Sequence, residues 1–378
     1  MRLPLIAVVF LGLLPGLRAE PANQIVLDIP STAEHPRNSE GSFIRLKSGR
    51  ILCYFSQFYG GSQDASAARI AVIHSDDGGL SWSLPGSFAE RGANQNLMSV
   101  SVLRLQSGRI ALFYVVKKSG IDCRPYVRIS SDETATWSPP APVLIAPGYY
   151  VLNNDRVIQT SRGRLIVPMT VRIVNESRMT GTDLLSPGAA QWIDLWYYSD
   201  DEGASWRQSP GWEVLPKPDN AVGLQEPGVV ELADGTLFGW ARTDQGCQYG
   251  YRSSDGGMTW SAPEPTALKS PISPATIRRV PGSATLLAVF NDHSGRFPYR
   301  RDADPYGGRS PLVVALSYDG GRTWPVRRPI ESAIRNEFAY TAIMFVGDQV
   351  LLAYSAAIGP EPHLGRLRIR RIALSWLR

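Results

Sequence analysis

The sequence predicts an all-β protein, a six-bladed β-propeller with four-stranded antiparallel blades, and two internal repeats support this prediction. The first repeat is an eight-residue box, S-x-D-x-G-x-[ST]-W, whose five copies recur at intervals of 54 to 69 residues. Repeats at such a period indicate an architecture built from one supersecondary unit. The boxes span Ser75–Trp82, Ser130–Trp137, Ser199–Trp206, Ser253–Trp260 and Ser317–Trp324, with Thr134 replacing the glycine of the second copy.

The second repeat is a pair of β-rich runs joined by turn residues, which is typical of a hairpin. Five of its six copies precede a further strand and a box, so each unit contains four strands. A ring of six such sheets leaves only short, protected edges. The run 366–377 is expected to close the ring beside 23–29. The six hairpins span 43–55, 102–114, 157–169, 229–241, 277–290 and 342–355.

The chemistry of the box predicts a structural role on the outer part of each blade. Its Asp can accept hydrogen bonds from nearby backbone N–H groups, and its Gly can adopt a positive φ, so the two together fix a tight turn. Its Trp is expected to bury a large ring between neighbouring strands. We therefore interpret the boxes as staples that do not bind a ligand.

Composition narrows the classes of partner and cofactor. The formal net charge of the chain is +5, with a pI of about 9.1, but the chain has no Lys/Arg run of the kind that tracks phosphates, so nucleic acid is not expected. The four histidines lack metal-ligand spacing, and neither a metal nor another cofactor is predicted. One disulfide is possible among Cys53, Cys123 and Cys247, but their wide separation in the sequence favours three buried thiols.

The first 19 residues predict a secretory signal peptide, with Arg2 before an apolar run and the small Ala19 at the cleavage position. The alternative is a retained N-terminal anchor. The run is too short to span a bilayer, and no later stretch is long enough. We expect residues 20–378 to form a single propeller domain, monomeric and secreted or periplasmic.

Polar residues stand at the starts of the strands expected to line the propeller axis. Because the innermost strands of all blades converge, these residues should share one central pocket. Such polarity at the mouth of apolar strands suits a glycan, which is the partner we expect. The candidates are Asn38–Glu40, Asn94–Asn96, Asn153–Arg156, Gln225, Glu226, Ser270–Ser273 and Glu337–Tyr340.

Five boxes on six blades resemble the sialidase (neuraminidase) superfamily, and the resemblance covers nearly all of the mature chain. The segment "LQEPGVVELADGTLFGWAR" is similar to the family's fourth blade, which implies that Glu226 is an acidic catalytic residue and Arg242 a carboxylate-binding arginine. "GGRSPLVVALSYDGGRTW" implies a second such arginine, Arg309, and "EFAYTAI" implies that Tyr340 is the nucleophile. Asp64, in a Gly- and Ser-rich loop, resembles the family's general acid.

The resemblance implies hydrolysis of a terminal α-linked sialic acid or related acidic sugar with retention of configuration. A carboxylate nucleophile would be repelled by the substrate carboxylate, whereas a neutral tyrosine would not. Because the pKa of free tyrosine is about 10, Tyr340 needs a base, and Glu226 would serve. Asp64 would protonate the leaving oxygen and then activate water.

One position departs from the family. Glu40 in "NSEGSFIRL" stands where sialidases have the first arginine of a three-arginine clamp. Either Arg37 or Arg156 supplies the missing cation, with Glu40 holding it in place, or the pocket accepts a different sugar whose hydroxyls bind Glu40, or Glu40 itself acts as a catalytic carboxylate. The remaining alternative is a propeller that binds carbohydrate without catalysis.

Two long insertions are expected near the pocket. The insertion 176–196 lengthens blade three, and its Trp192 either stacks on a sugar ring or belongs to the core. The loop 291–309 is rich in Arg and Tyr, which suits a polar glycan.

Overall fold

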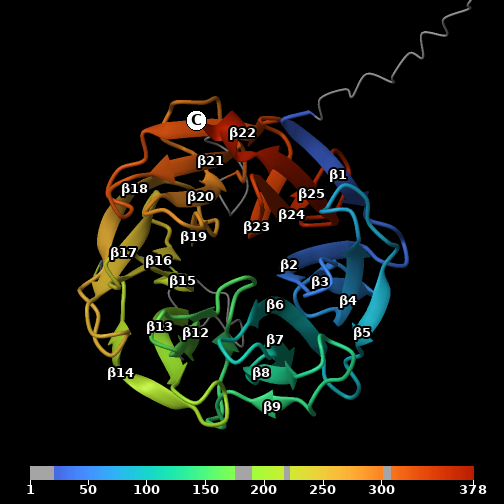
Figure 1. The fold of residues 1–378 in the computed structure, drawn as a ribbon, viewed down its shortest axis with the longest axis vertical. Helices are drawn as coiled ribbons and strands as arrows, with labels where there is room; N and C mark the ends of the chain where they lie inside the picture. The colour runs from blue at the N-terminus through green and yellow to red at the C-terminus, as the bar shows by residue number, and fades with distance from the viewer. Residues whose placement is uncertain (1–20, 175–189, 217–221, 301–307) are drawn as a thin grey trace, which may run out of the picture.

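Six antiparallel sheets form a ring around a central axis in the computed structural model of the chain, which confirms the predicted six-bladed β-propeller (Figure 1). The structure describes residues 21–174, 190–216, 222–300 and 308–378. The predicted signal peptide, residues 1–19, therefore lies outside the described residues. No helix within the described ranges is long and apolar enough to cross a membrane.

The first three blades follow each other along the chain, each built from the hub outwards. Blade one comprises β2 (Arg37–Arg45), β3 (Ile51–Tyr59), β4 (Ala67–Ser75) and β5 (Gly86–Ala89). Blade two comprises β6 (Asn96–Arg104), β7 (Ile110–Lys117), β8 (Cys123–Ser130) and β9 (Ala141–Pro142). In blade three the innermost strand is split in two, and the blade comprises β10 (Tyr150–Val151), β11 (Ile158–Gln159), β12 (Leu165–Val174), β13 (Ala190–Ser199) and β14 (Arg207–Glu213).

The other three blades complete the ring. Blade four comprises β15 (Gln225–Glu231), β16 (Leu237–Arg242), β17 (Cys247–Ser253) and β18 (Glu264–Lys269). Blade five comprises β19 (Thr276–Arg279), β20 (Leu286–Asn291), β21 (Leu312–Ser317) and β22 (Val326–Glu331). Blade six comprises β23 (Glu337–Val346), β24 (Gln349–Ala357), β25 (Arg366–Ala373) and the N-terminal β1 (Asn23–Ile29), with a short 3-10 helix, η2 (Leu374–Leu377), after β25.

The ring closes where the sequence predicts, because β1 pairs antiparallel with β25 at the edge of blade six. The register runs from Asn23 opposite Ile372 to Ile29 opposite Leu367. The first and last strands of the described chain, β1 and β25, thus lie in one sheet, and β1 is the outermost strand of the last blade (Figure 1).

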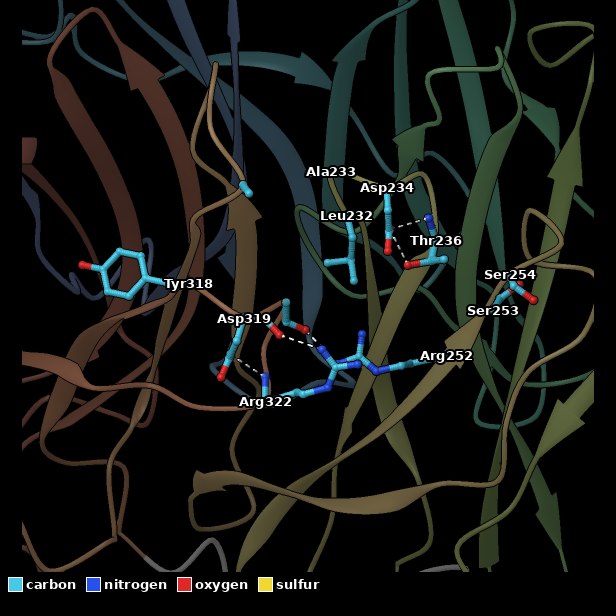
Figure 2. Close-up of a pocket in the computed structure, with 12 residues that line it drawn as sticks. Leu232, Ala233, Asp234, Thr236, Arg252, Ser253, Ser254, Tyr318, Asp319 and Arg322 are labelled. Atoms are coloured by element: carbon cyan, nitrogen blue, oxygen red, sulfur yellow. Dashed lines mark hydrogen bonds between the residues drawn. The ribbon is translucent and has the colours of Figure 1, made fainter.

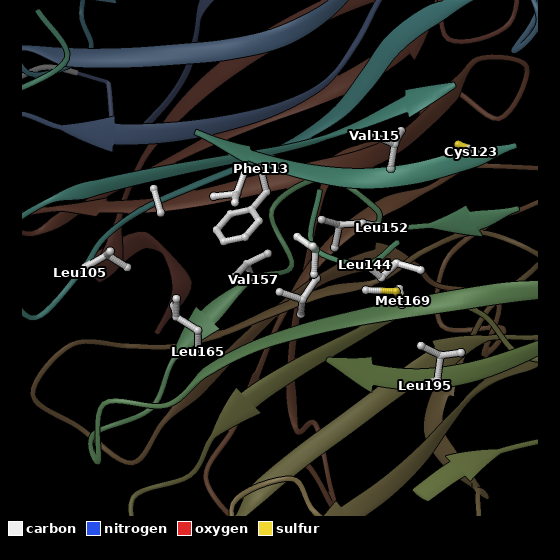
Figure 3. Packing of buried hydrophobic residues seen from close by; sticks show 14 residues of the cluster. Leu105, Phe113, Val115, Cys123, Leu144, Leu152, Val157, Leu165, Met169 and Leu195 are labelled. Atoms are coloured by element: carbon white, nitrogen blue, oxygen red, sulfur yellow. The ribbon is translucent and has the colours of Figure 1, made fainter. Parts of the chain in front are cut away.

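Apolar side chains fill the spaces between neighbouring blades. Between blades two and three, Phe113 and Val115 of β7 pack towards Leu165 and Met169 of β12 (Figure 3). Full burial of one such side chain contributes about 1.5–3 kcal/mol relative to exposure, so these layers supply most of the driving force that holds adjacent blades together.

The first box shows how each turn is fixed. The carboxylate of Asp77 accepts hydrogen bonds from the backbone N–H groups of Leu80 and Ser81, at 3.0 and 2.9 Å, and from the hydroxyls of Ser75 and Ser81. In the second box Thr134 adopts a φ of 74° and its N–H donates to Ser130, so threonine takes the conformation that glycine has elsewhere. The predicted turn chemistry is confirmed.

The tryptophans of the boxes join neighbouring blades. Trp206 of blade three lies edge-on to Phe113 of blade two, with 5.9 Å between ring centroids, and Trp137 of blade two lies 6.3 Å from Tyr54 of blade one. Of the five rings only that of Trp324 is fully buried, and the other four are half-buried. The boxes therefore clamp adjacent blades, and the predicted burial of the ring is complete only for Trp324.

The three cysteines are free and buried in the core, as favoured from the sequence over a disulfide. Burial raises the pKa of the Cys123 thiol to about 12, so it stays protonated at neutral pH. These residues act as small apolar groups.

A buried aspartate ties the blades together at the hub. Asp155, with a φ of 57°, accepts hydrogen bonds from the Ser42 hydroxyl of blade one and the Ile343 N–H of blade six, both at 3.0 Å. It also pairs with the Arg278 guanidinium of blade five at 2.8 Å. One carboxylate from blade three thus links three other blades, which fixes the relative positions of the innermost strands.

Close packing in blade four yields a stability prediction. A Cβ on Gly239 of β16 would overlap the Tyr251 ring and lie 3.2 Å from Cζ3 of Trp260. Gly239→Ala is expected to lower the free energy of unfolding by about 1–3 kcal/mol, because the surrounding rings must shift. Gly86→Ala is the control, since the nearest atom to its Cβ would be 3.9 Å away. Equal denaturation midpoints for the two variants would contradict this packing.

Candidate active site

A cavity of about 430 Å³ opens at the hub of the propeller. Blades one to four and blade six contribute its walls, and the described part of blade five does not reach it. The charged and phenolic side chains that line it are Glu40, Asp64, Lys117, Tyr149, Arg172, Glu226, Arg242 and Tyr340. Four residues predicted to form the catalytic site, Asp64, Glu226, Arg242 and Tyr340, thus come together from three blades.

The cavity and the Asp boxes lie at opposite ends of the strands. In blade one, Ile51 of β3 pairs with Ser75, where the box begins. At the other end of the same strand, Tyr59 pairs with Ala67, which follows the loop that carries Asp64. The boxes are therefore remote from the cavity, which fits their structural role.

Another hollow lies at the box end, between blades four and five, with a volume of about 460 Å³ (Figure 2). Its side chains are engaged in the turns themselves. Arg252 donates to the backbone oxygen of Gly320 at 2.8 Å, and Asp234 accepts hydrogen bonds from the N–H and hydroxyl of Thr236. This hollow offers no arrangement comparable to the tyrosine and carboxylates of the hub cavity.

A shared backbone irregularity aims side chains into the hub cavity. Glu40, Ser99, Glu226 and Tyr340 each lie on the innermost strand of their blade, with φ between 53 and 59°. At each of them the register with the neighbouring strand shifts, as in a β-bulge. Non-glycine residues rarely adopt this conformation, and bulges often re-aim a side chain beside an active site. Three predicted site residues occupy these positions.

Tyr340, Glu226 and Arg242 form one hydrogen-bonded group. The Tyr340 hydroxyl donates to Glu226 Oε1 at 3.1 Å, and Arg242 Nε lies 3.2 Å from Glu226 Oε2. Arg242 Nη1 lies 3.4 Å from the Tyr340 oxygen, and its Nε also donates to Gln225 at 2.9 Å. Burial and then the Glu226 charge raise the pKa of Tyr340 to about 12. The phenol is therefore protonated at neutral pH, with a carboxylate placed to accept its proton.

Arg309 lies behind the Tyr340 ring. Its guanidinium carbon is 5.4 Å from the ring centroid, and Nη2 donates to the backbone oxygen of Ile272 at 3.5 Å. The side chain is buried and does not line the cavity. Arg309 is thus close enough to affect Tyr340 electrostatically, whereas Arg242 faces the cavity directly.

Arg37 lies between two carboxylates in blade one. Its Nη2 is 2.8 Å from Glu40 Oε1, its Nη1 is 2.5 Å from Asp64 Oδ1, and its guanidinium covers the Phe58 ring at 4.4 Å. Glu40 also accepts a hydrogen bond from the Ser99 hydroxyl at 3.0 Å. The arrangement matches the hypothesis that Glu40 holds Arg37 in place, and it neutralises the charge of Arg37.

The two carboxylates around Arg37 differ in exposure and acidity. The Glu40 side chain is 3% exposed, and burial raises its pKa although Arg37 opposes the shift. The Asp64 side chain is 69% exposed. Desolvation of its carboxyl group favours the acid form, but Arg37 outweighs this effect and holds the pKa of Asp64 below its usual value. Asp64 is therefore ionised and accessible in this arrangement.

Arg156, the other candidate for the missing cation, is directed towards blade five. Its Nη1 donates to Thr276 Oγ1 at 2.9 Å and its Nη2 to the backbone oxygen of Ala275 at 2.7 Å. Burial lowers its pKa to about 10, and it does not line the cavity. Of the two arginines, Arg37 is the one that contacts Glu40.

The family model of the BNR repeat-like domain matches residues 49–352, which is most of the chain. The chain belongs to this family. No curated protein is similar enough in sequence to count as a match.

Solved structures of similar fold include two sialidases. The Hadza microbial sialidase Hz136 superimposes with a TM-score of 0.69 at 18% identity, covering 91% of this chain and 67% of its own. The intramolecular trans-sialidase of Ruminococcus gnavus gives a TM-score of 0.69 at 15% identity, covering 93% and 97%. A protein of unknown function from Dyadobacter fermentans gives 0.68 at 17%, covering 93% and 100%. These likenesses confirm that this BNR repeat-like domain has the sialidase fold.

Sequence reasoning missed one wall of the cavity in this BNR repeat-like domain. Lys117, at the end of β7, donates to the backbone oxygen of Asp64 at 2.9 Å. Arg172 of β12 covers the Tyr149 ring, with 4.3 Å from its guanidinium carbon to the ring centroid. Trp192, for which stacking and core roles both remained open, is half-buried and lines the cavity. Two parts of the predicted long insertions lie outside the described residues: 176–189 of the insertion that carries Trp192, and 301–307 of the loop 291–309.

A buried network supports Glu226 from behind. The Glu226 N–H donates to the Thr170 hydroxyl at 3.0 Å, and that hydroxyl donates to Asp194 Oδ1 at 3.0 Å. Tyr251 OH donates to the other oxygen of Asp194 at 2.8 Å. The network fixes the backbone of Glu226 in its left-handed conformation.

The network predicts a pH dependence of stability. Burial raises the pKa of Asp194 to about 8, so the folded state keeps a proton that the unfolded state releases near pH 4. The stabilisation is complete below pH 4 and is lost as the pH rises towards 8, by at most about 1.4 kcal/mol per pH unit. Asp194→Asn, which stays neutral, is expected to flatten the unfolding free energy between pH 4 and 8. The unfolding free energy is measured by denaturant titration at each pH. If it depended on pH as steeply in Asp194→Asn as in the unmodified protein, the assignment to Asp194 would be wrong.

Proposed function

We propose that this BNR repeat-like domain is an exo-acting glycoside hydrolase that removes a terminal α-linked acidic sugar, of the sialic acid type, from glycans. The main support is the hydrogen bond between the Tyr340 hydroxyl and Glu226, in a cavity where Asp64 is exposed on another wall. A tyrosine next to a carboxylate base fits a substrate whose own carboxylate would repel an anionic nucleophile. The likeness in fold to sialidases agrees with this chemistry but does not by itself establish it.

In the first half of the proposed reaction, Glu226 accepts the phenol proton while the Tyr340 oxygen bonds to the anomeric carbon. The bond from that carbon to the leaving oxygen breaks, and protonated Asp64 gives its proton to this oxygen. In the second half Asp64 removes a proton from water, and the resulting hydroxide attacks the anomeric carbon. The tyrosine oxygen then leaves and regains its proton from Glu226. Two inversions give overall retention.

Each positive charge has a place in this scheme. Arg242 faces the cavity beside Tyr340, where it can bind the substrate carboxylate and stabilise the developing phenolate. Arg309, behind the ring, adds a second positive charge to the same site. Arg37 holds Glu40 and positions Asp64.

Asp64 must gain a proton before it can act as an acid. Its carboxylate is mostly exposed, and the ion pair with Arg37 keeps it ionised without a ligand. A bound glycan would exclude water from this carboxylate and separate it from Arg37, and both changes raise the pKa of a carboxylic acid. The proposal therefore includes a rise in the pKa of Asp64 when the substrate binds.

A second candidate is hydrolysis of a different, non-sialic sugar. The observation that favours it is the buried Glu40, which occupies the position expected for a clamp arginine and neutralises Arg37. In that case Glu40 would accept hydrogen bonds from sugar hydroxyls, or act as a catalytic carboxylate in its own right. A carbohydrate-binding propeller without catalysis is the third alternative.

Turnover of aryl glycosides distinguishes the candidates. The purified protein is incubated with an aryl α-sialoside and with a panel of neutral and uronic aryl glycosides, and release of the aryl alcohol is followed. Release from the sialoside or another acidic glycoside supports the first proposal, and release from neutral sugars alone supports the second. If the protein bound the glycosides but released the aryl alcohol from none of them, both enzymatic proposals would be wrong.

A further inference from the structure

Two cations share an aromatic platform on the wall formed by blades two and three. Arg172 covers the Tyr149 ring at 4.3 Å, and the Lys117 ammonium lies 5.4 Å from the centroid of the same ring. Trp192 lies edge-on to Tyr149 with 6.1 Å between centroids and 5.9 Å from the Arg172 guanidinium. All four side chains line the hub cavity. We name this group the cationic wall.

The cationic wall differs electrically from the other cations of the hub. Arg37 is paired with Glu40 and Asp64, and Arg242 with Glu226. Within the ranges that the structure describes, no carboxylate pairs with Lys117 or Arg172. Lys117 donates a hydrogen bond to the backbone oxygen of Asp64, and Arg172 donates one to the backbone oxygen of Gly120. Their positive charge is therefore available to a ligand.

Burial makes this charge costly unless a ligand compensates for it. Lys117 is 6% exposed, and desolvation lowers its pKa even though Asp64 is near. Nε of Arg172 is buried without a hydrogen-bond partner among the described residues. An anionic group that entered the cavity would offer both side chains charge-assisted hydrogen bonds in a partly water-excluded site.

The aromatic members suit a saccharide as carrier of that anion. The half-buried Tyr149 and Trp192 rings offer apolar surface next to the two cations. A sugar has an apolar ring face and a polar edge, so it can pack on these rings while its acidic substituent reaches the cations. Lys117 also holds the backbone of Asp64, which links occupancy of the wall to the loop that carries this aspartate.

We propose that the cationic wall is a recognition subsite for an anionic group, carboxylate or sulfate, of the saccharide bound in the hub cavity. The subsite is separate from Arg242 and Arg309 beside Tyr340. This inference rests on the proposed function, because it assigns substrate specificity within the same cavity. Arg172 and Lys117 are its specificity-determining residues.

Calorimetric binding to four saccharides tests the subsite: lactose and its 3′-sialyl, 3′-glucuronyl and 3′-sulfo derivatives. Full-length protein carrying Tyr340→Phe is used, so that turnover does not consume the ligand. At least one acidic derivative is expected to bind about ten-fold or more tightly than lactose, as charge-assisted contacts predict. The derivative that binds best identifies the anion as carboxylate or sulfate, and the preference should weaken as salt is added.

Variants assign the preference to the wall. Arg172→Gln, alone and with Lys117→Gln, should remove most of the preference and leave lactose affinity unchanged, whereas Arg172→Lys should retain part of it. Lys118→Gln is the matched control, since this neighbouring lysine is exposed and does not line the cavity. Equal affinity for all four saccharides, or a preference that survives the double substitution, would overturn the proposal. Turnover of the aryl glycoside panel by the unmodified protein tests the catalytic proposal separately, because that assay depends on Tyr340 and Glu226 and does not compare variants of the wall.

Discussion

Replacement of Tyr340 by phenylalanine is expected to lower kcat by about 10³-fold or more on any sugar that the protein hydrolyses, as for loss of a nucleophile elsewhere. The substitution removes one oxygen and keeps the ring that packs near Arg309. Affinity for the substrate should change little, because Arg242, the proposed partner of the substrate carboxylate, remains. Initial rates over a range of substrate concentrations separate the two parameters.

Tyr354→Phe is the matched control for this experiment. Tyr354 lies in the same blade, is buried, and donates its hydroxyl to Glu331 at 2.6 Å, so the variant loses a comparable hydrogen bond. It does not line the cavity, and its kcat should equal that of the unmodified protein. If both variants lost activity equally, or if Tyr340→Phe stayed fully active, the role assigned to Tyr340 would be wrong.

Glu226→Gln is expected to lower kcat by about 10²–10⁴-fold, the range typical of a lost general base. The amide can still accept a hydrogen bond from Tyr340, but it cannot take the phenol proton. Burial is the larger cause of the raised pKa of Tyr340 and persists in the variant, so little phenolate forms near neutral pH without that base. The residual activity should therefore rise with pH over the alkaline range, where the activity of the unmodified protein is expected to stay constant.

Glu231→Gln provides the comparison on the same strand. Glu231 ends β15 and accepts hydrogen bonds from the N–H and hydroxyl of Ser161, far from the cavity end of the strand. Its substitution should alter stability slightly and leave kcat and its pH profile unchanged. A profile for Glu226→Gln parallel to that of the unmodified protein would argue against Glu226 as the base.

The fold was predictable because its signals are local and repeated. Each box contains its own hydrogen-bond donors and acceptors, as Asp77 and Ser75 show, and each hairpin has its turn residues between apolar runs. Even the closure of blade six by the N-terminal strand follows from two β-rich runs without partners nearby in the sequence. The split innermost strand of blade three was not foreseen, because the predicted hairpin begins at 157 and no strand was predicted at Tyr150–Val151.

Part of the site could also be found from spacing. Glu40, Ser99 and Glu226 each stand nine residues before the turn glycine of their hairpin, and all three have positive φ. This recurrence marks the bulge position that faces the hub. Glu40 and Glu226 were predicted from their place at the starts of the innermost strands and from the family resemblance, but the shared nine-residue spacing was not used.

Other contacts depend on tertiary geometry that no local pattern encodes. Lys117 and Lys118 are adjacent and chemically identical, yet only Lys117, the last residue of β7, lines the cavity, whereas Lys118 lies beyond the strand and is exposed. Arg172 of β12 stacks on the ring of Tyr149, which lies on a different segment of the blade, and this contact cannot be predicted from the sequence near either residue. Likewise, Asp64 is kept ionised by an ion pair with Arg37, which stands at the start of β2, 27 residues earlier in the chain.

Covalent labelling of the nucleophile is the sharpest test of the role proposed for Tyr340. The protein is incubated with an activated fluorosugar of whichever glycone it accepts, digested with a protease, and mapped by mass spectrometry. If Tyr340 is the nucleophile, a single glycosyl adduct is expected on the peptide that contains Tyr340, and none on the Tyr340→Phe variant. An adduct on Glu40, Asp64 or Glu226 instead would contradict this role.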